Sequence, residues 1–130
     1  MKVSFDFDNT LSLENVQQYA KELIDKGIIV YIVTARQPIV GAYEYAGYIF
    51  DNLALFAITD KLGIKRENIF FCSGNLKANY FLEHPEFIWH LDDDLNEIIS
   101  IGRHTKVHGI QVGVDDWMDK CDELINKYLC

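Results

Sequence analysis

The sequence predicts an α/β protein with a three-layer, Rossmann-like fold, in which a central five-stranded parallel sheet carries helices on both faces. Short β-rich runs alternate with longer helical runs along the whole chain, the pattern of a parallel sheet with right-handed crossovers. The run at residues 28–33 is continuously apolar, as expected of a strand that is covered on both sides. No internal repeat and no Pro/Gly/Ser-rich linker breaks this alternation, so residues 1–130 are expected to form one domain.

Five strands and five helices follow from the alternation. We expect the strands at residues 2–7, 28–33, 69–72, 87–91 and 107–112. The first helix is indicated by apolar residues at helical spacing between Ser12, which is suited to cap it, and Gly27, which is suited to end it. The other helices are expected at residues 42–56, 77–83, 95–101 and 115–128.

The composition is that of an ordinary folded protein. Hydrophobic residues make up 49% and charged residues 25% of the chain, which excludes a disordered or collagen-like protein. Twelve Lys and Arg against 20 Asp and Glu give a net charge of −8, which disfavours general binding to nucleic acid or to an anionic membrane surface. Three cysteines without a CxxC pair indicate neither a disulfide framework nor a zinc site. With no apolar run near the roughly 20 residues of a membrane span and no secretory signal, we expect a cytoplasmic protein.

Polar residues suited to catalysis follow four of the predicted strands, at the edge where parallel sheets bind their ligands. They are Asp6 and Asp8, Thr34 and Arg36, Lys77, and the run Asp92, Asp93 and Asp94. Each also has a purely structural interpretation, as a turn residue, a strand former, a helix cap or an exposed helix residue.

Three features favour a functional site over those structural interpretations. Asp6 lies within a hydrophobic run, where a carboxylate needs a cation or a strong donor. The adjacent carboxylates at residues 92–94 repel one another, and a divalent cation such as Mg²⁺, which prefers hard oxygen ligands, would relieve this repulsion. Lys77 opposes the dipole of the helix that it opens, unless an anion is held there. Carboxylates, a hydroxyl and an ammonium together supply what phosphoryl transfer requires: a nucleophile, a proton donor and charge neutralisation.

These residues resemble the motifs of the haloacid dehalogenase (HAD) superfamily of aspartate-nucleophile hydrolases. The first motif, a hydrophobic strand followed by DxDx[TV], matches residues 3–11, and the second, a strand ending in Thr or Ser, matches residues 32–36. The lysine that opens a helix is best matched by Lys77, with Lys61 and Lys65 as alternatives, and the strand with paired acids matches residues 88–93. The motifs occur in order, and the rest of the chain supplies the fifth strand and the last helix of a HAD-like core.

The resemblance implies a Mg²⁺-dependent phosphomonoesterase that acts through an aspartyl-phosphate intermediate. Asp6 would be the nucleophile and a metal ligand. Asp8 would serve as general acid and then base, and would bind the metal through its carbonyl oxygen. Its presence points to the cleavage of phosphate esters, because the dehalogenases and phosphonate-cleaving members lack this acid.

The remaining motif residues would bind substrate and metal. Thr34 and Lys77 would hold the phosphoryl group. Arg36 is suited to a substrate anion or, equally, to an ordinary salt bridge. Asp92 would ligate Mg²⁺ with the help of Asp93, and the three consecutive acids leave a register one residue later, with Asp94, open.

The spacing of the motifs implies a minimal member without a cap domain. Only 25 residues separate Asp8 from Thr34, so even the small flap that often follows the first motif is expected to be trimmed or missing. Such members often act on large substrates or use a neighbouring subunit as a lid, so an oligomer is compatible with the sequence. The aromatic cluster around residues 43–50 is expected to serve in packing rather than as a platform for stacking a nucleobase, and His90 is expected in the core.

Several functional hypotheses follow. The main one is a phosphatase for a small phosphorylated metabolite, with a nucleotide slightly preferred because of the arginine and the aromatic cluster. The alternatives are a phosphatase for a macromolecular phosphate, such as a nucleic-acid terminus or a phosphoprotein, and a non-catalytic phosphate-binding scaffold of the same fold. A response-regulator receiver is disfavoured, because its phosphorylated Asp should end the third strand and its Lys the fifth, and neither residue is present there.

Overall fold

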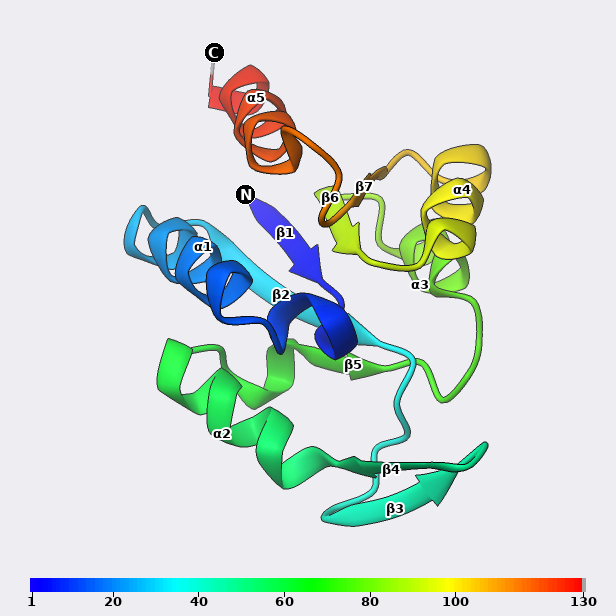
Figure 1. Ribbon diagram of the computed structural model, residues 1–130. Helices are drawn as coiled ribbons and strands as arrows, with labels where there is room; N and C mark the ends of the chain where they lie inside the picture. Colours follow the sequence, from blue (N-terminus) through cyan, green and yellow to red (C-terminus); the bar gives the residue numbers. More distant parts are fainter. Residues whose placement is uncertain (130) are drawn as a thin grey trace.

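The computed structural model describes residues 1–129 and contains a five-stranded parallel sheet flanked by helices (Figure 1). The strands of the sheet are β1 (Lys2–Phe5), β2 (Ile29–Thr34), β5 (Ile69–Phe71), β6 (Phe87–Asp92) and β7 (His108–Gln111). Their order is β5-β2-β1-β6-β7, and every neighbouring pair is parallel. The predicted α/β class and the five predicted strands are confirmed, each strand to within two residues at either end.

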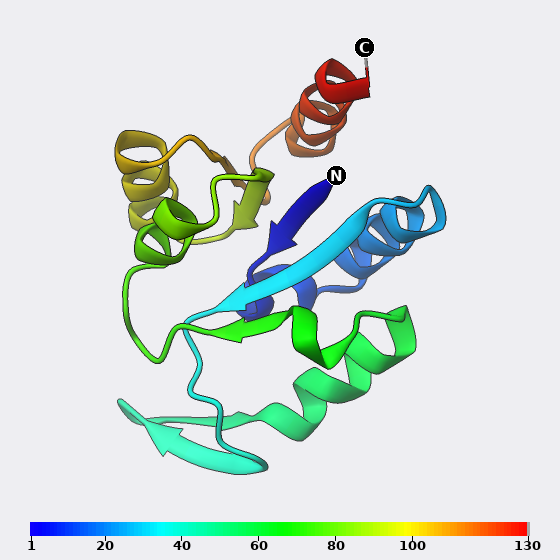
Figure 2. The ribbon, with the colours of Figure 1, turned by 180° about the vertical axis from the view of Figure 1, so that it is seen from behind.

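Helices cover both faces of the sheet, as Figures 1 and 2 show from opposite sides. One face packs against α1 (Glu14–Asp25), α2 (Asn52–Leu62) and α5 (Trp117–Leu129), and the other against α3 (Lys77–Glu83) and α4 (Leu95–His104). A separate cluster of buried apolar side chains fills each interface. This three-layer arrangement leaves the edge formed by the carboxyl ends of the strands for the connecting loops, where the polar residues of the sequence motifs lie.

Helix α1 illustrates how the sequence pattern produces this packing. Its buried residues are Val16, Tyr19, Ala20 and Leu23, which recur at intervals of three or four and so form one stripe of the helix. The Tyr19 ring packs at 5.4 Å between ring centroids against Trp117 of α5, so this stripe ties two helices to the same face of the sheet.

The prediction of a single helix over residues 42–56 was wrong in its first part. Residues there form an antiparallel hairpin of β3 (Ala42–Tyr45) and β4 (Tyr48–Asp51), and α2 begins only at Asn52. Ala46 and Gly47 join the strands with φ angles of 53° and 83°, the left-handed pair that a two-residue hairpin turn requires. Figures 1 and 2 both show the hairpin outside the main sheet.

The chain turns sharply after β1. Residues Phe7–Leu11 form a single wide helical turn in which Asn9 adopts a φ of 57°. Helix α1 follows at Glu14, so no strand lies between this turn and α1, as the motif spacing predicts. A short 3₁₀ turn (Arg66–Asn68) leads from α2 into β5.

The pairing of β1 with β6 is irregular. Lys2 lies opposite Phe87, but Ser4 lies opposite His90 and Phe5 opposite Leu91, so β6 contains one residue more than β1 over this stretch. None of the helices in residues 1–129 combines the length and the apolar character needed to span a bilayer.

Candidate active site

The centre of the candidate site is a buried ammonium held between two carboxylates. Asp6 follows β1, Asp92 ends the neighbouring strand β6, and Lys77 is the first residue of α3. Lys77 Nζ lies 2.8 Å from Asp6 Oδ1 and 2.6 Å from Asp92 Oδ2, and the three side chains are 3%, 7% and 0% exposed, respectively. Lys77 is 71 positions from Asp6 and 15 from Asp92 along the chain, and the parallel sheet brings the three together.

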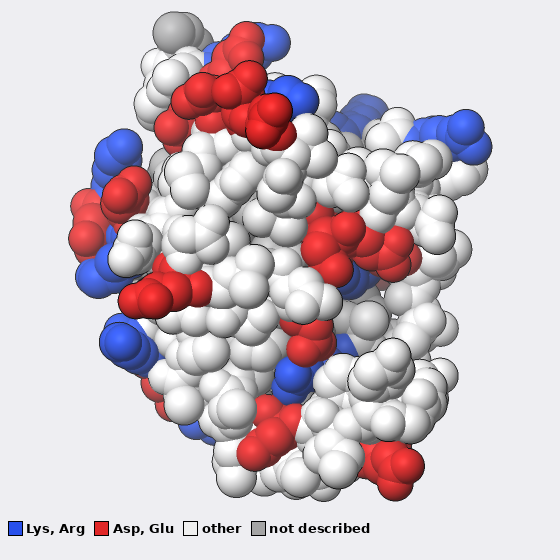
Figure 3. Space-filling model, in the orientation of Figure 1, with Lys and Arg blue, Asp and Glu red and all other residues white. Residues whose placement is uncertain are grey.

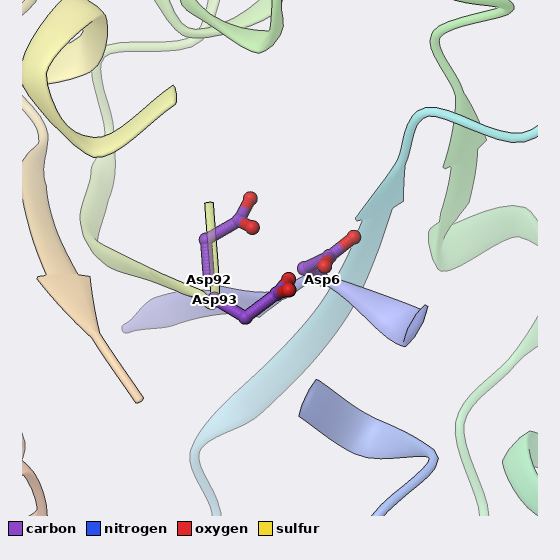
Figure 4. A group of neighbouring side chains, drawn as sticks. All are labelled: Asp6, Asp92 and Asp93. Atoms are coloured by element: carbon purple, nitrogen blue, oxygen red, sulfur yellow. The ribbon is translucent and has the colours of Figure 1, made fainter. Parts of the chain in front are cut away.

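A third carboxylate lies next to this group. Asp6, Asp92 and Asp93 can each offer a ligand atom so that all of these atoms lie within 4.8 Å of one another, and Figure 4 shows their side chains gathered at the ends of β1 and β6. Asp94 instead accepts a hydrogen bond from the Asn96 amide at 2.9 Å and caps α4. Of the two registers that the sequence leaves open, Asp92 with Asp93 is therefore the one adjacent to Asp6.

The pKa values of Asp6 and Asp92 are shifted in opposite directions. Burial raises the pKa of the Asp6 carboxyl well above its ordinary value, although the Lys77 ammonium opposes this shift. Burial also acts to raise the pKa of Asp92, but the hydrogen bond from His90 and the charge of Lys77 outweigh it and hold that pKa low. The three carboxylates form a cluster of oxygen ligands that could hold a metal ion.

His90 and Ser4, which the sequence did not place in the site, form a chain of hydrogen bonds that ends on Asp92. His90 Nε2 lies 2.8 Å from Asp92 Oδ2, and His90 Nδ1 lies 2.8 Å from the Ser4 hydroxyl oxygen. Burial lowers the pKa of His90 despite the neighbouring carboxylate, so the ring is neutral. A neutral ring that donates from Nε2 to Asp92 and accepts from the Ser4 hydroxyl satisfies both contacts. His90 lies in the core, as predicted, and its contact with Asp92 is the feature that sequence reasoning missed.

Asp8 is held by Arg36. The guanidinium donates from Nε to Asp8 Oδ2 at 3.0 Å and from Nη2 to Asp8 Oδ1 at 2.8 Å, a two-pronged pairing. Its Nη1 donates to the Asp51 carbonyl at 3.1 Å and to Asn52 Oδ1 at 3.2 Å. The Arg36 side chain also lies near the rings of Phe7 and Phe50, 4.9 and 5.2 Å from their centroids. Arg36 therefore connects the hairpin and the start of α2 to Asp8.

Thr34 occupies a different position from the other motif residues. It ends β2 and is fully buried, and its hydroxyl oxygen accepts a hydrogen bond from the Arg36 amide at 3.2 Å. The loop at residues 73–75 lies against the same strand end, because Ser73 and Gly74 donate backbone hydrogen bonds to the carbonyls of Arg36 and Ala35. Thr34 does not line the cavity described next, whereas Ala35 and Gly74 do.

Two adjoining cavities open at this edge of the sheet. The acidic cavity has a volume of about 320 Å³. Its lining residues are Asp6, Asp8, Asn9, Ala35, Gly74, Asn75, Lys77, Asp92, Asp93, Asp94 and Glu97. The second cavity, of about 200 Å³, shares Asp8, Ala35 and Gly74 with the first and is otherwise lined by aromatic and polar side chains. A larger cavity between α1 and α2 includes Lys61, one of the two alternative lysines, but no other predicted site residue.

Acidic side chains gather around this edge of the sheet. Figure 3 shows red side chains among mainly uncharged ones in the middle of the view, with some blue atoms beside them, and most of the other Lys and Arg side chains at its periphery. Within the acidic cavity Lys77 is the one lysine, and it is already paired with two carboxylates. A substrate phosphate would therefore meet a negative surface unless a cation accompanied it.

The sequence matches no protein-family model. No curated protein matches it either. The geometry of the site and the sequence motifs are therefore the basis for the functional conclusion.

Proposed function

We propose that this chain is a Mg²⁺-dependent phosphomonoester hydrolase of the HAD type. The observation that carries the proposal is the contact of one buried ammonium, Lys77, with both Asp6 and Asp92, next to a third carboxylate and to Asp8. The two carboxylates line a cavity, and their pKa values are shifted in opposite directions, which favours a catalytic site. The order of the motifs along the chain supports the same assignment.

The reaction would take place in two steps. In the first, an Asp6 carboxylate oxygen bonds to phosphorus while the ester P–O bond breaks and its electron pair leaves with the alcohol oxygen. Asp8, which takes up a proton when one of its oxygens turns from Arg36 to the leaving group, donates that proton to the alcohol oxygen. In the second, Asp8, now ionised, accepts a proton from a water molecule whose oxygen bonds to phosphorus. The bond from phosphorus to Asp6 then breaks, which releases inorganic phosphate and restores the carboxylate.

Asp6, Asp92 and Asp93 would hold the metal, whose charge would allow a phosphate dianion to approach the carboxylates. Lys77 would hold the Asp6 carboxylate in place and stabilise a phosphoryl oxygen beside it. The neutral His90 ring would fix the orientation of Asp92 through its Nε2–H, as partners of ligating carboxylates commonly do.

Arg36 would position Asp8 rather than bind a substrate anion directly. All of its guanidinium nitrogens already donate to Asp8, Asp51 or Asn52. Both Asp8 oxygens accept hydrogen bonds from the Arg36 side chain, which is only 9% exposed. Asp8 itself is 41% exposed, so it remains within reach of a leaving group in the cavity.

The test measures hydrolysis of an aryl phosphate by the native chain, in Mg²⁺ and in EDTA, and by three variants in Mg²⁺. Asp6→Asn is expected to lower kcat/KM by more than about 10³-fold, and Asp8→Asn by about 10²–10⁴-fold. Asp60→Asn is the matched control, because Asp60 is an exposed aspartate on α2 that pairs with Arg66 away from the site. It is expected to retain the native rate.

Turnover that requires Mg²⁺ and disappears in Asp6→Asn would support the proposal, as would an acid-stable ³²P label on the native chain that is absent from this variant. Turnover that persists in Asp6→Asn would exclude Asp6 as the nucleophile. Phosphate binding with no hydrolysis of any ester would instead identify the chain as a phosphate-binding scaffold.

A further inference from the structure

The hairpin β3–β4 presents an aromatic face toward the candidate site. Tyr43 pairs with Phe50, and Tyr45 with Tyr48, and side chains of directly paired residues lie on the same face of a hairpin. The rings of Tyr43 and Phe50 stack with their centroids 5.6 Å apart and their planes at 30°. Tyr43 Oη also accepts a hydrogen bond from the Gln37 amide at 3.0 Å, which ties the hairpin to the segment after β2.

Part of this face forms the wall of the second cavity. Tyr43, Tyr45 and Phe50 line it together with Asp8, so its aromatic wall begins next to the proposed proton donor. Its volume of about 200 Å³ is below the roughly 300 Å³ of the smallest drug-sized ligand sites, so it suits one ring system rather than a whole molecule. The acidic cavity shares Asp8, Ala35 and Gly74 with it, so one ligand that extends across those residues would contact both cavities.

The second cavity offers no free positive charge. Arg36 is the one basic residue in its lining, and each of its guanidinium nitrogens already donates to Asp8, Asp51 or Asn52. A further phosphate or carboxylate on the substrate would gain little there. An uncharged planar ring would instead find ring faces to stack on and, in Gln37, an amide among the lining residues.

We propose that the second cavity is a leaving-group subsite for a planar heteroaromatic ring, so that the substrate is a nucleoside 5′-monophosphate. This inference rests on the proposed phosphatase function: the phosphate lies in the acidic cavity, the ribose crosses the shared residues and the base stacks against the hairpin. Tyr45 is a specificity-determining residue, because it lines the cavity and remains 57% exposed.

The test compares nucleoside 5′-monophosphates with ribose 5-phosphate, which has the same scissile bond but no base. The four common ribonucleoside monophosphates are assayed in turn, and the best is expected to exceed ribose 5-phosphate by about ten-fold in kcat/KM, equivalent to about 1.4 kcal/mol of stacking. Equal kcat/KM for all five esters would overturn the subsite while leaving the proposed phosphatase intact.

Two variants on the same hairpin locate the effect. Tyr45→Leu is expected to lower kcat/KM for the nucleotide by about ten-fold, to leave ribose 5-phosphate within two-fold of native, and to be rescued by Tyr45→Phe. Tyr48→Leu is the matched control: Tyr48 lies opposite Tyr45 and is 70% exposed, but it does not line the cavity. An equal loss in Tyr48→Leu would indicate a general effect on the hairpin and would overturn the assignment.

If no ester is hydrolysed, that result counts against the phosphatase activity alone, and binding measurements can still test the subsite for the base. Calorimetry with Mg²⁺ would then test the subsite. Binding of a nucleoside monophosphate at least ten-fold tighter than ribose 5-phosphate, with this difference lost in Tyr45→Leu, would support it. Equal affinities would refute it. Hydrolysis confined to a 5′-phosphorylated oligonucleotide would also overturn the assignment, because the substrate would be a nucleic-acid terminus, which the net charge of −8 disfavours.

Discussion

Replacing Asp6 by asparagine is expected to abolish activity and, without a divalent cation, to make the fold more stable. The buried group of Asp6, Asp92 and Lys77 carries two negative charges and one positive charge when both carboxyls are ionised. The amide side chain of the Asp6→Asn variant would keep an oxygen that accepts the hydrogen bond from Lys77, and Lys77 would keep Asp92 at 2.6 Å. The variant therefore leaves no buried charge without a partner.

The magnitude follows from two opposing terms. Weakening a charged hydrogen bond to a neutral one costs about 1 kcal/mol. The Asp6 carboxylate is 7% exposed, so the native chain bears a desolvation penalty of several kcal/mol, and attraction to Lys77 offsets only part of it. The variant avoids this penalty. We expect the free energy of unfolding to rise by about 0.5–2 kcal/mol, the gain typical of relieving an active-site strain.

The pH dependence has a definite sign. The pKa of Asp6 is raised in the fold above its ordinary value of 3.8, so the folded chain binds this proton more tightly than the unfolded chain. The stability that the protonated carboxyl contributes is present below the unfolded pKa and is lost as the pH rises through the raised, folded pKa. The gain in free energy of unfolding from Asp6→Asn should therefore be absent near pH 4, grow between the unfolded and the folded pKa of Asp6, and level off at higher pH.

Urea denaturation in EDTA, at several pH values, measures this difference. The same series with Mg²⁺ should reverse the order, because a cation at 100 times its Kd stabilises the native chain by about 2.7 kcal/mol and the variant lacks one ligand. An Asp6→Asn variant that is less stable than the native chain in EDTA at pH 7 would show that the Lys77 ion pair outweighs desolvation, and would refute this reasoning.

Three further predictions concern other parts of the structure. Lys77→Met should lower the free energy of unfolding by about 3–5 kcal/mol in urea titrations at pH 7, because it leaves two buried carboxylates without their ammonium; a loss below about 1 kcal/mol would contradict the burial of this ion pair. Gly109→Ala should cost about 1–3 kcal/mol, because a Cβ there would lie 2.9 Å from the Ile98 carbonyl oxygen of α4, and an unchanged melting temperature would exclude that close approach. Burial raises the pKa of the Cys72 thiol to about 11, so at pH 8 only about 0.1% is thiolate and alkylation should be far slower than in urea; equal rates in both states would show that the thiol is accessible.

The edge of the sheet at which the acidic residues lie could be predicted because it depends on topology. Parallel strands end at the same edge of a sheet, so acids that follow its strands, such as Asp6 and Asp92, lie at that edge. The strand and helix positions followed from periodicity, and the helix predicted at residues 77–83 is confirmed as α3. The roles of these residues in catalysis remain predictions.

The hairpin was missed because its turn has an unusual sequence. A two-residue turn with two left-handed residues is normally signalled by Asn-Gly or Asp-Gly, and here the pair is Ala46-Gly47. The alternation of aromatic residues on either side of it, at residues 43 and 45 and again at 48 and 50, was the available signal. The same alternation, read as a helix, could not show that one aromatic face would line a cavity.

The side-chain pairings could not be predicted for a different reason. Arg36 donates to Asp8 and to Asn52 at the start of α2, which are 28 and 16 positions away along the chain. The contact of His90 with Ser4 depends on which residues of β1 and β6 lie opposite each other. Strand pairing register is a property of the assembled sheet, and no pattern within either strand specifies it.

The extra residue in β6 decides on which side of the sheet Asp92 emerges. Side chains alternate along a strand, so one inserted residue exchanges inside for outside for every position that follows. Ser4 is opposite His90, which places Asp92 level with Asp6; with Ser4 opposite Trp89 instead, Leu91 would stand beside Asp6 and the second acid would point to the other face. The pairing of Ser4 with His90 thus keeps the two acidic motifs level, and a shift of β6 by one residue against β1 would separate the two acids while leaving both motifs intact.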